Sequence, residues 1–113
     1  MTRFVIPIVV LLATLAPLPA LAQDQAQIDH GKQVYAAQRC SLCHAIGGTG
    51  NAKGPLDNVG SKLGEDDLRL WIVDAVAMAK KAGAERKPAM KNFTNIPDED
   101  LAALVAYLAS LKS

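Results

Sequence analysis

The two cysteines of the chain lie three positions apart, in the run Cys40-Ser41-Leu42-Cys43-His44. A C-x-x-C-H run is the attachment pattern of a c-type haem. With two residues between them, both thiols face one edge of a porphyrin, where they add across its two vinyl groups to form thioethers. The histidine that follows is then directed at the iron, for which an imidazole nitrogen is a good axial ligand.

Three other kinds of site also use paired cysteines. A thioredoxin-like redox pair belongs to a βαβ unit, and the sequence shows no pattern of parallel strands. A closed zinc site needs four ligands, whereas His30 is the one other histidine and no further cysteine exists. A plain disulfide in an oxidising compartment would make His44 a coincidence. Haem attachment is therefore the favoured interpretation.

Three segments are predicted to be helices that position this motif. Residues 25–38 carry a narrow apolar stripe, and Gly31 inside it indicates the close approach of another backbone or side chain. Residues 65–82 repeat apolar side chains at helical spacing, with acidic residues in the first turn and lysines in the last. Residues 97–111 begin with a proline and continue as an apolar face. The two long loops between these helices are expected to hold a cofactor.

The N-terminus has the layout of a secretory signal peptide. Arg3 is followed by an apolar run at 4–16, two prolines and the small-residue site Ala20-Leu21-Ala22. The run is shorter than the roughly 20 residues that a membrane span needs, so we expect cleavage after Ala22, no stable membrane insertion and a periplasmic location. An uncleaved anchor is the alternative.

Cleavage would leave residues 23–113 as one domain, close to the size at which a core needs help from a cofactor, metal or disulfide. This domain has 11 basic and 11 acidic residues, so no overall field favours nucleic acid. Five basic residues nevertheless cluster within twelve positions. This cluster is either a docking surface for an acidic partner or an ordinary solvated helix end and loop. They are Lys80, Lys81, Arg86, Lys87 and Lys91.

The domain resembles the class I cytochromes c over residues 28–111. The motifs that carry the resemblance follow the family's order: Gly31 with Tyr35, the C-x-x-C-H run, Gly54-Pro55-Leu56, Met90 with Phe93, and Leu104-Val105-Ala106-Tyr107-Leu108. The resemblance implies an all-α fold, the small cytochrome c fold, with three main helices and long loops wrapped around one covalently bound haem c.

The resemblance also implies an iron bound by His44 on one side and by a methionine on the other. Met90 is the expected ligand because it lies in a loop outside any helical period, although Lys91 replaces the proline that commonly follows. The Pro55 carbonyl is expected to accept the ring N–H of His44, which would fix the ring. Trp71 is expected either to donate to a haem propionate or to be a core aromatic.

A six-coordinate iron would make the protein an electron carrier and not an enzyme, with redox partner proteins docking near the haem edge. Two alternatives stay open. The chain could be the cytochrome subunit of a periplasmic dehydrogenase or oxidase complex. It could instead bind or sense gases, if Met90 is not a ligand.

Overall fold

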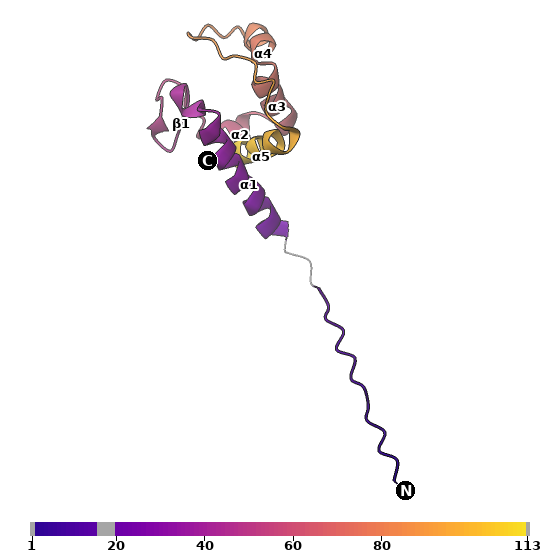
Figure 1. Cartoon of the computed structure of the whole chain (residues 1–113). Helices are drawn as coiled ribbons and strands as arrows, with labels where there is room; N and C mark the ends of the chain where they lie inside the picture. The colour runs from indigo at the N-terminus through magenta and orange to yellow at the C-terminus, as the bar shows by residue number, and fades with distance from the viewer. Residues whose placement is uncertain (1, 16–19, 113) are drawn as a thin grey trace.

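The computed structural model describes residues 2–15 and 20–112, with side chains described from residue 24 onward in the second range. Residues 2–15 are extended and exposed (Figure 1). Pro17 and Pro19 of the expected signal peptide lie outside the described residues, as do the side chains of Ala20-Leu21-Ala22, so cleavage there stays a prediction. Across the two described ranges, no helix combines the length and hydropathy that crossing a membrane requires.

From residue 20 onward, the regular elements of the described chain are helices apart from one small hairpin. In chain order the elements are α1 (Ala20–Ala37), the 3₁₀ turn η1 (Cys40–Leu42), β1 (Ala45–Ile46), β2 (Thr49–Gly50), α2 (Val59–Lys62), α3 (Glu65–Val73), α4 (Ala75–Ala82) and α5 (Asp98–Ala109). The strands β1 and β2 are antiparallel, with Ala45 opposite Gly50 and Ile46 opposite Thr49. This architecture agrees with the expected all-α class.

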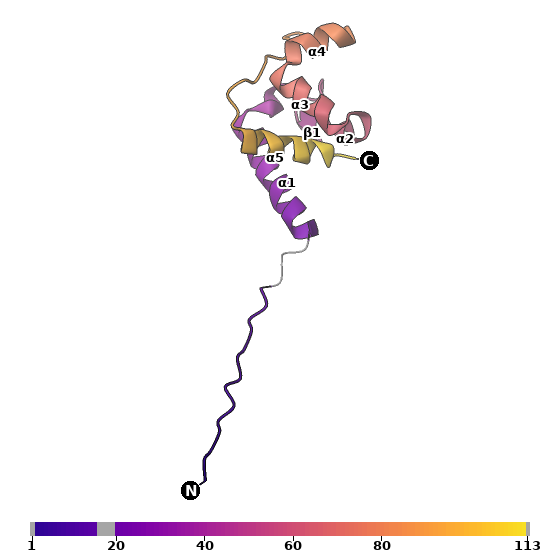
Figure 2. The same ribbon diagram turned by 90° about the vertical axis from the view of Figure 1, so that its right-hand side faces the viewer.

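The helices α1 and α5 cross at Gly31 (Figure 2). A Cβ atom on Gly31 would clash with the carbonyl oxygen of Ala103 and would lie 2.6 Å from the Cβ of Tyr107. Tyr35, one turn further along α1, meets Tyr107 edge to face, with ring centroids 5.9 Å apart. The close approach predicted from the glycine is therefore present, and it fixes the direction in which α1 delivers the cysteine motif.

The hydrophobic core lies between α1, α3 and α5. The apolar face of α5 supplies most of it because its leucines recur every three to four residues. Several half-buried side chains of the loops, among them Leu56, Phe93 and Ile96, pack against this core and extend it towards the site. The buried members are Val34, Leu68, Ile72, Leu101, Leu104, Val105 and Leu108.

Residues 65–82 form two helices where the sequence predicts one. The break lies at Asp74, whose φ of −138° and ψ of 45° are not helical. In a continuous helix the N–H of Val76 would donate to the carbonyl of Ile72. Both groups bond instead to residues 92–93 of the following loop. The prediction was wrong here because apolar spacing says nothing about partners that arrive from elsewhere in the chain.

Candidate functional site

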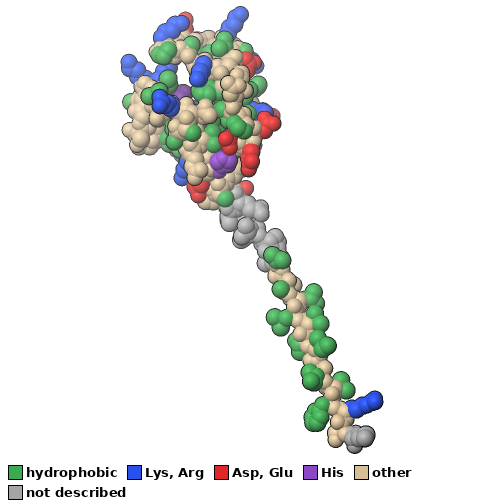
Figure 3. Space-filling model, viewed as in Figure 1, with side chains coloured by type: hydrophobic (Ala, Val, Ile, Leu, Met, Phe, Trp, Pro, Cys, Tyr) green, Lys and Arg blue, Asp and Glu red, His purple; other side chains and the backbone are tan. Residues whose placement is uncertain are grey.

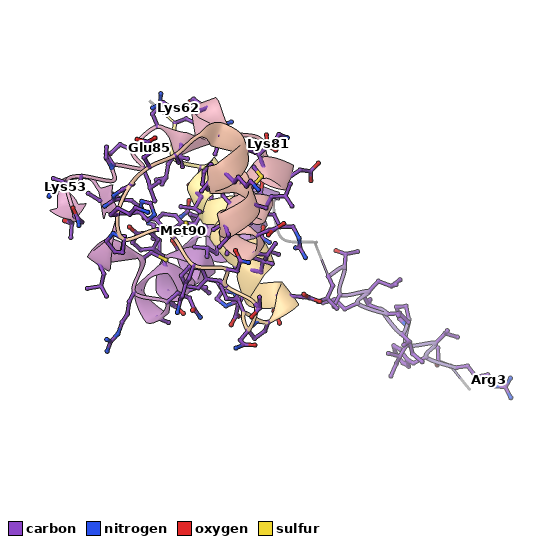
Figure 4. The ribbon with its side chains drawn as sticks, turned by 90° about the horizontal axis from the view of Figure 1, so that it is seen from above. Arg3, Lys53, Lys62, Lys81, Glu85 and Met90 are labelled. Carbon is purple, nitrogen blue, oxygen red and sulfur yellow. The ribbon has the colours of Figure 1, made fainter. Side chains whose placement is uncertain are left out.

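A cavity of about 530 Å³ opens beside the core, within the size range of ligand sites. Its wall brings together five of the six predicted site residues, namely Cys40, Cys43, His44, Trp71 and Met90. In the stick view Met90 lies near the middle of the domain, whereas Lys53 and Lys62 lie at its edge (Figure 4). The remaining wall is mostly apolar. It includes Tyr35, Leu56, Val59, Leu63, Leu68, Ile72, Phe93, Ile96, Leu104 and Leu108.

The cysteine motif leaves α1 through a left-handed residue. Arg39 has φ 57° and ψ 37°, and this turn redirects the chain into η1. The carbonyl of Cys40 then accepts the N–H groups of Cys43 at 3.1 Å and of His44 at 2.9 Å. One tight turn therefore presents both thiols and the imidazole to the same cavity, as the spacing predicts.

Asn51 secures this turn from outside, and sequence reasoning missed it. Its backbone N–H donates to the carbonyls of Ser41 at 3.1 Å and His44 at 2.9 Å. Its side-chain amide donates to the carbonyl of Leu42 at 3.1 Å. An asparagine after a glycine-rich run is a common turn signal, but nothing local shows that its hydrogen bonds return to the cysteine motif.

The ring of His44 is held by Gly54 and not by Pro55, which corrects the prediction. The Nδ1–H of His44 donates to the Gly54 carbonyl at 3.1 Å. The same carbonyl accepts the N–H of Ala45 at 3.0 Å, while Leu56 donates to the Ala45 carbonyl at 2.8 Å. This pairing places Pro55 opposite Ala45. Because successive carbonyls of an extended segment point to opposite sides, the Gly54 carbonyl faces the ring and that of Pro55 does not.

The protonation of the site favours ligation by the histidine. Burial lowers the pKa of His44, the hydrogen bond to Gly54 raises it, and the positive charge of Arg86 lowers it further. With the proton on Nδ1, the neutral ring keeps a lone pair on Nε2, the form in which histidine binds metals. Burial raises the pKa of the Cys40 thiol to about 11. A thiol that stays protonated is a poor redox nucleophile, which argues against a thioredoxin-like pair.

The structure also disfavours a disulfide and a zinc site as interpretations of the two cysteines. Cys40 and Cys43 are both free thiols. His30 pairs with Asp100, with 2.9 Å between Nε2 and the carboxylate oxygen, at the α1–α5 crossing. Within the described residues, no three side chains of the His, Cys, Asp and Glu types are grouped to hold a metal ion. The structure therefore offers a zinc ion no closed ligand shell.

Met90 lies in a loop that the structure ties down just after it. Asn92 accepts the N–H of Val76 through its Oδ1 at 2.9 Å, and the N–H of Phe93 donates to the carbonyl of Ile72 at 2.9 Å. The Nζ of Lys91 lies 5.0 Å from the centre of the Phe93 ring, over its face. Asn92 gave no signal in the sequence, because its partner is sixteen residues away in a helix expected to be continuous.

Arg86 reaches across the site from the same loop. Its Nη1 occupies the space that a Cβ atom on Gly54 would take. The guanidinium thus packs against the residue that orients the His44 ring. This position gives Arg86 a contact inside the domain in addition to its place among the five clustered basic residues.

The residues of the wall fit a covalently held haem. Two thiols, an imidazole and a thioether are the donor set that such a group uses, and the apolar remainder suits a large flat ring. The hydroxyl of Tyr35 is buried, lies on this wall and makes no hydrogen bond with the described residues. Burial, followed by the nearby Cys40, raises the pKa of Tyr35 to about 12. Met78 is half-buried and is not on the wall, in agreement with the choice of Met90.

Charges on the surface are unevenly distributed. Lys and Arg side chains gather over the end of the domain where α4 lies, and Asp and Glu side chains gather on the side where α5 begins (Figure 3). The first turn of α5 is acidic, and the last turn of α4 contains Lys80 and Lys81. Lys80, Lys81, Arg86, Lys87 and Lys91 are all exposed. Their role towards a partner stays a prediction, as does the role of Trp71 towards a propionate.

Comparisons with known proteins agree with the site. The family model described as Cytochrome c matches residues 28–112. Cytochrome c oxidase subunit 2 of Alkalihalophilus pseudofirmus is 33% identical over 93 residues, which cover 74% of this chain and 25% of that protein. A subunit of the nicotinate dehydrogenase of Pseudomonas putida is 32% identical over 116 residues, which cover 88% of this chain and 10% of that protein.

The chain thus spans a quarter or less of the length of these two curated relatives. No solved structure matches it significantly. The family model covers most of the chain, including the cysteine motif, the Met90 loop and α5. The chain belongs to the cytochrome c family.

Proposed function

We propose that the protein is a periplasmic one-electron carrier, with haem c attached through Cys40 and Cys43 and its iron bound by His44 and Met90. The observation that carries this proposal is the shared wall of one cavity, on which both thiols, the imidazole and the thioether meet. The family membership supports the haem. The proposed ligand pair and the location rest on the sequence and the geometry.

The chain's own residues perform three tasks in this proposal. Cys40 and Cys43 would anchor the cofactor, and His44, oriented by the Gly54 carbonyl, would present a neutral nitrogen. Met90 would supply a soft thioether as the second ligand, and a histidine–methionine pair raises the reduction potential relative to many other ligand pairs. When bound, the haem supplies a ferrous–ferric couple. With both His44 and Met90 as ligands, electron transfer would be favoured over the binding of small molecules.

Redox partners would dock near the basic residues of the α4 end and the loop that follows it. Lys80, Lys81, Arg86, Lys87 and Lys91 are exposed, and Arg86 and Lys91 also line the cavity. Since the domain that remains after the proposed cleavage is formally neutral, attraction of an acidic partner would depend on this local group. Salt would therefore slow the association.

The test is spectroscopic. The purified protein, expressed with haem maturation factors, should retain its visible absorption after acid–acetone extraction, and the ferric form should show a near-infrared band from methionine ligation. Met90→Ala should lose that band and bind carbon monoxide readily in the ferrous state. Met78→Ala is the matched control and should keep the band. A wild-type protein that binds carbon monoxide as readily as Met90→Ala would refute the ligand assignment and favour a gas-binding function.

A second candidate is a cytochrome subunit of a larger oxidase or dehydrogenase complex. The names of the two curated relatives favour it, since both are subunits. The sequence and the site suit either role. Size-exclusion chromatography of the native protein from its source distinguishes them, because a free carrier elutes at the size of one small domain. Mass spectrometry of the same material reports whether the chain begins at residue 23.

A further inference from the structure

We propose that Asn92, together with the backbone of Phe93, positions Met90 by bonding into the break between α3 and α4. This inference rests on the proposed function, in which Met90 is an iron ligand. It assigns to Asn92 the role of a positioning residue, which acts on Met90 through the loop and does not touch the iron.

At the break between α3 and α4, two groups that would bond to each other in a continuous helix bond instead to the Met90 loop. The N–H of Val76 and the carbonyl of Ile72 would bond to each other in an uninterrupted α-helix. Here the Val76 N–H donates to Oδ1 of Asn92 at 2.9 Å, and the Ile72 carbonyl accepts the N–H of Phe93 at 2.9 Å. The adjacent residues Asn92 and Phe93 thus insert between two groups that would otherwise satisfy each other.

These bonds are placed to restrain Met90. Asn92 lies only two residues after Met90, so a loop fixed at residues 92–93 leaves little freedom to the methionine. Ile72 is a buried core residue and also lines the cavity, so the anchor is attached to a rigid part of the fold. Phe93 is half-buried and packs against the same core. Before Met90, no backbone hydrogen bond within the described part of the chain ties residues 85–89 in a comparable way.

The side chain of Asn92 also acts as the N-terminal cap of α4. Asp74, at the position that normally supplies a cap, makes no side-chain cap bond. An N-terminal N–H left without a partner destabilises a helix, so Asn92 has a defined role that alanine cannot perform. Aspartate at position 92 would retain an acceptor oxygen, and its negative charge would suit the N-terminus of α4.

The experiment measures how easily Met90 leaves the ferric iron. Imidazole is the probe, since it binds ferric haem only when the methionine has moved away. The haem-bearing Asn92→Ala variant should bind imidazole about fivefold faster than wild type, the effect of losing one typical cap, and its near-infrared methionine band should weaken. Asn92→Asp should restore both values. Asn95→Ala, at an exposed asparagine of the same loop, should match wild type.

A second control separates positioning from general destabilisation. Gly31→Ala is expected to weaken the α1–α5 crossing, whose close contacts with Ala103 and Tyr107 involve neither residues 90–93 nor the break at Asp74. It should therefore lower thermal stability without the same gain in imidazole binding. The inference is overturned if Asn92→Ala behaves like Asn95→Ala, or if Gly31→Ala accelerates imidazole binding as much as Asn92→Ala does. Absence of the methionine band in wild type would instead overturn the proposed ligand pair, so the two failures are distinguishable.

Discussion

Replacing Gly31 by alanine should destabilise the domain, although alanine is the better helix former. The added Cβ would clash with the Ala103 carbonyl oxygen and lie 2.6 Å from the Cβ of Tyr107, whereas ordinary contacts begin at 3.4 Å. The helices α1 and α5 would have to separate by about 0.8 Å or more. Both obstacles are backbone or Cβ atoms, which cannot turn away by changing a rotamer.

Two opposing terms decide the size of the effect. Alanine in place of a helical glycine contributes about 1 kcal/mol in favour of folding. Overpacking of a tight interface costs about 1–3 kcal/mol, and the rigid surroundings of Gly31 place the cost near the upper end. The net loss in the free energy of unfolding is therefore about 1–2 kcal/mol. For a domain of this size that corresponds to a fall in Tm of about 5–15 °C.

Denaturant titration of the haem-bearing protein, followed by the helical circular dichroism signal, measures this loss. Gly64→Ala is the matched control, because Gly64 has φ −73° and an added Cβ meets nothing within 4 Å. Because Gly64 is the N-cap of α3, a position at which alanine is less favourable than glycine, that variant should lose less than about 1 kcal/mol. If Gly31→Ala were as stable as wild type or more stable, the close crossing of α1 and α5 would be refuted.

Three further predictions concern the site and its surface. Arg86→Gln should lower the midpoint potential by roughly 30 mV, half of the 59 mV that corresponds to a tenfold change, because it removes a positive charge beside His44. Lys53→Gln is the control, since it removes an equal charge at the edge of the domain and should shift the potential less in potentiometric titration. Equal shifts in the two variants would contradict the placement of Arg86 beside the His44 site. Tyr35→Phe should change the free energy of unfolding by less than about 1 kcal/mol, because the buried hydroxyl bonds to none of the described residues. Tyr35→Leu should cost about 0.5–1.5 kcal/mol more, because it removes the ring contact with Tyr107. A larger loss for Tyr35→Phe in urea titrations would show that the hydroxyl has a partner in the haem-bearing protein. Oxidation of the ferrous protein by ferricyanide should slow as salt is added, and Lys81→Gln should flatten that dependence in stopped-flow measurements; a rate insensitive to salt would leave the basic residues without a steering role.

The sequence predicted the features of the site that depend on short spacing. The motif from Cys40 to His44 forms one turn of backbone, and the glycine at position 31 marks the helix crossing. Met90 could be separated from Met78 because one lies outside a helical period and the other within it. For the cysteine motif and the two methionines, the deciding neighbours lie within a turn or two along the chain, where residue type and spacing decide the structure. Gly31 indicated a close approach by its residue type alone, since its partners Ala103 and Tyr107 lie far along the chain.

The features that the sequence did not predict depend on partners far along the chain. The break at Asp74 is stabilised by residues about eighteen positions later, and Asn51 bonds back to a turn that precedes it by nine positions or so. The helix boundaries also differ from the predicted ones: α1 begins at residue 20 instead of 25, and α5 ends at residue 109 instead of 111. Such boundaries are set by capping and tertiary contacts that a pattern of apolar residues does not contain.

The difference between Gly54 and Pro55 shows why a resemblance locates a segment better than an atom. The resemblance implies a backbone carbonyl of the Gly54-Pro55 segment beside His44, and the structure has one. Which of the two carbonyls faces the ring is decided by the register of the pairing with Ala45, in which Gly54 accepts and Leu56 donates. A shift of that register by one residue would exchange the directions of the two carbonyls without any change in the amino-acid sequence. The orientation of His44, the proposed iron ligand, is therefore set by a backbone pairing. Substitutions that leave this pairing intact should leave the orientation of the His44 ring unchanged.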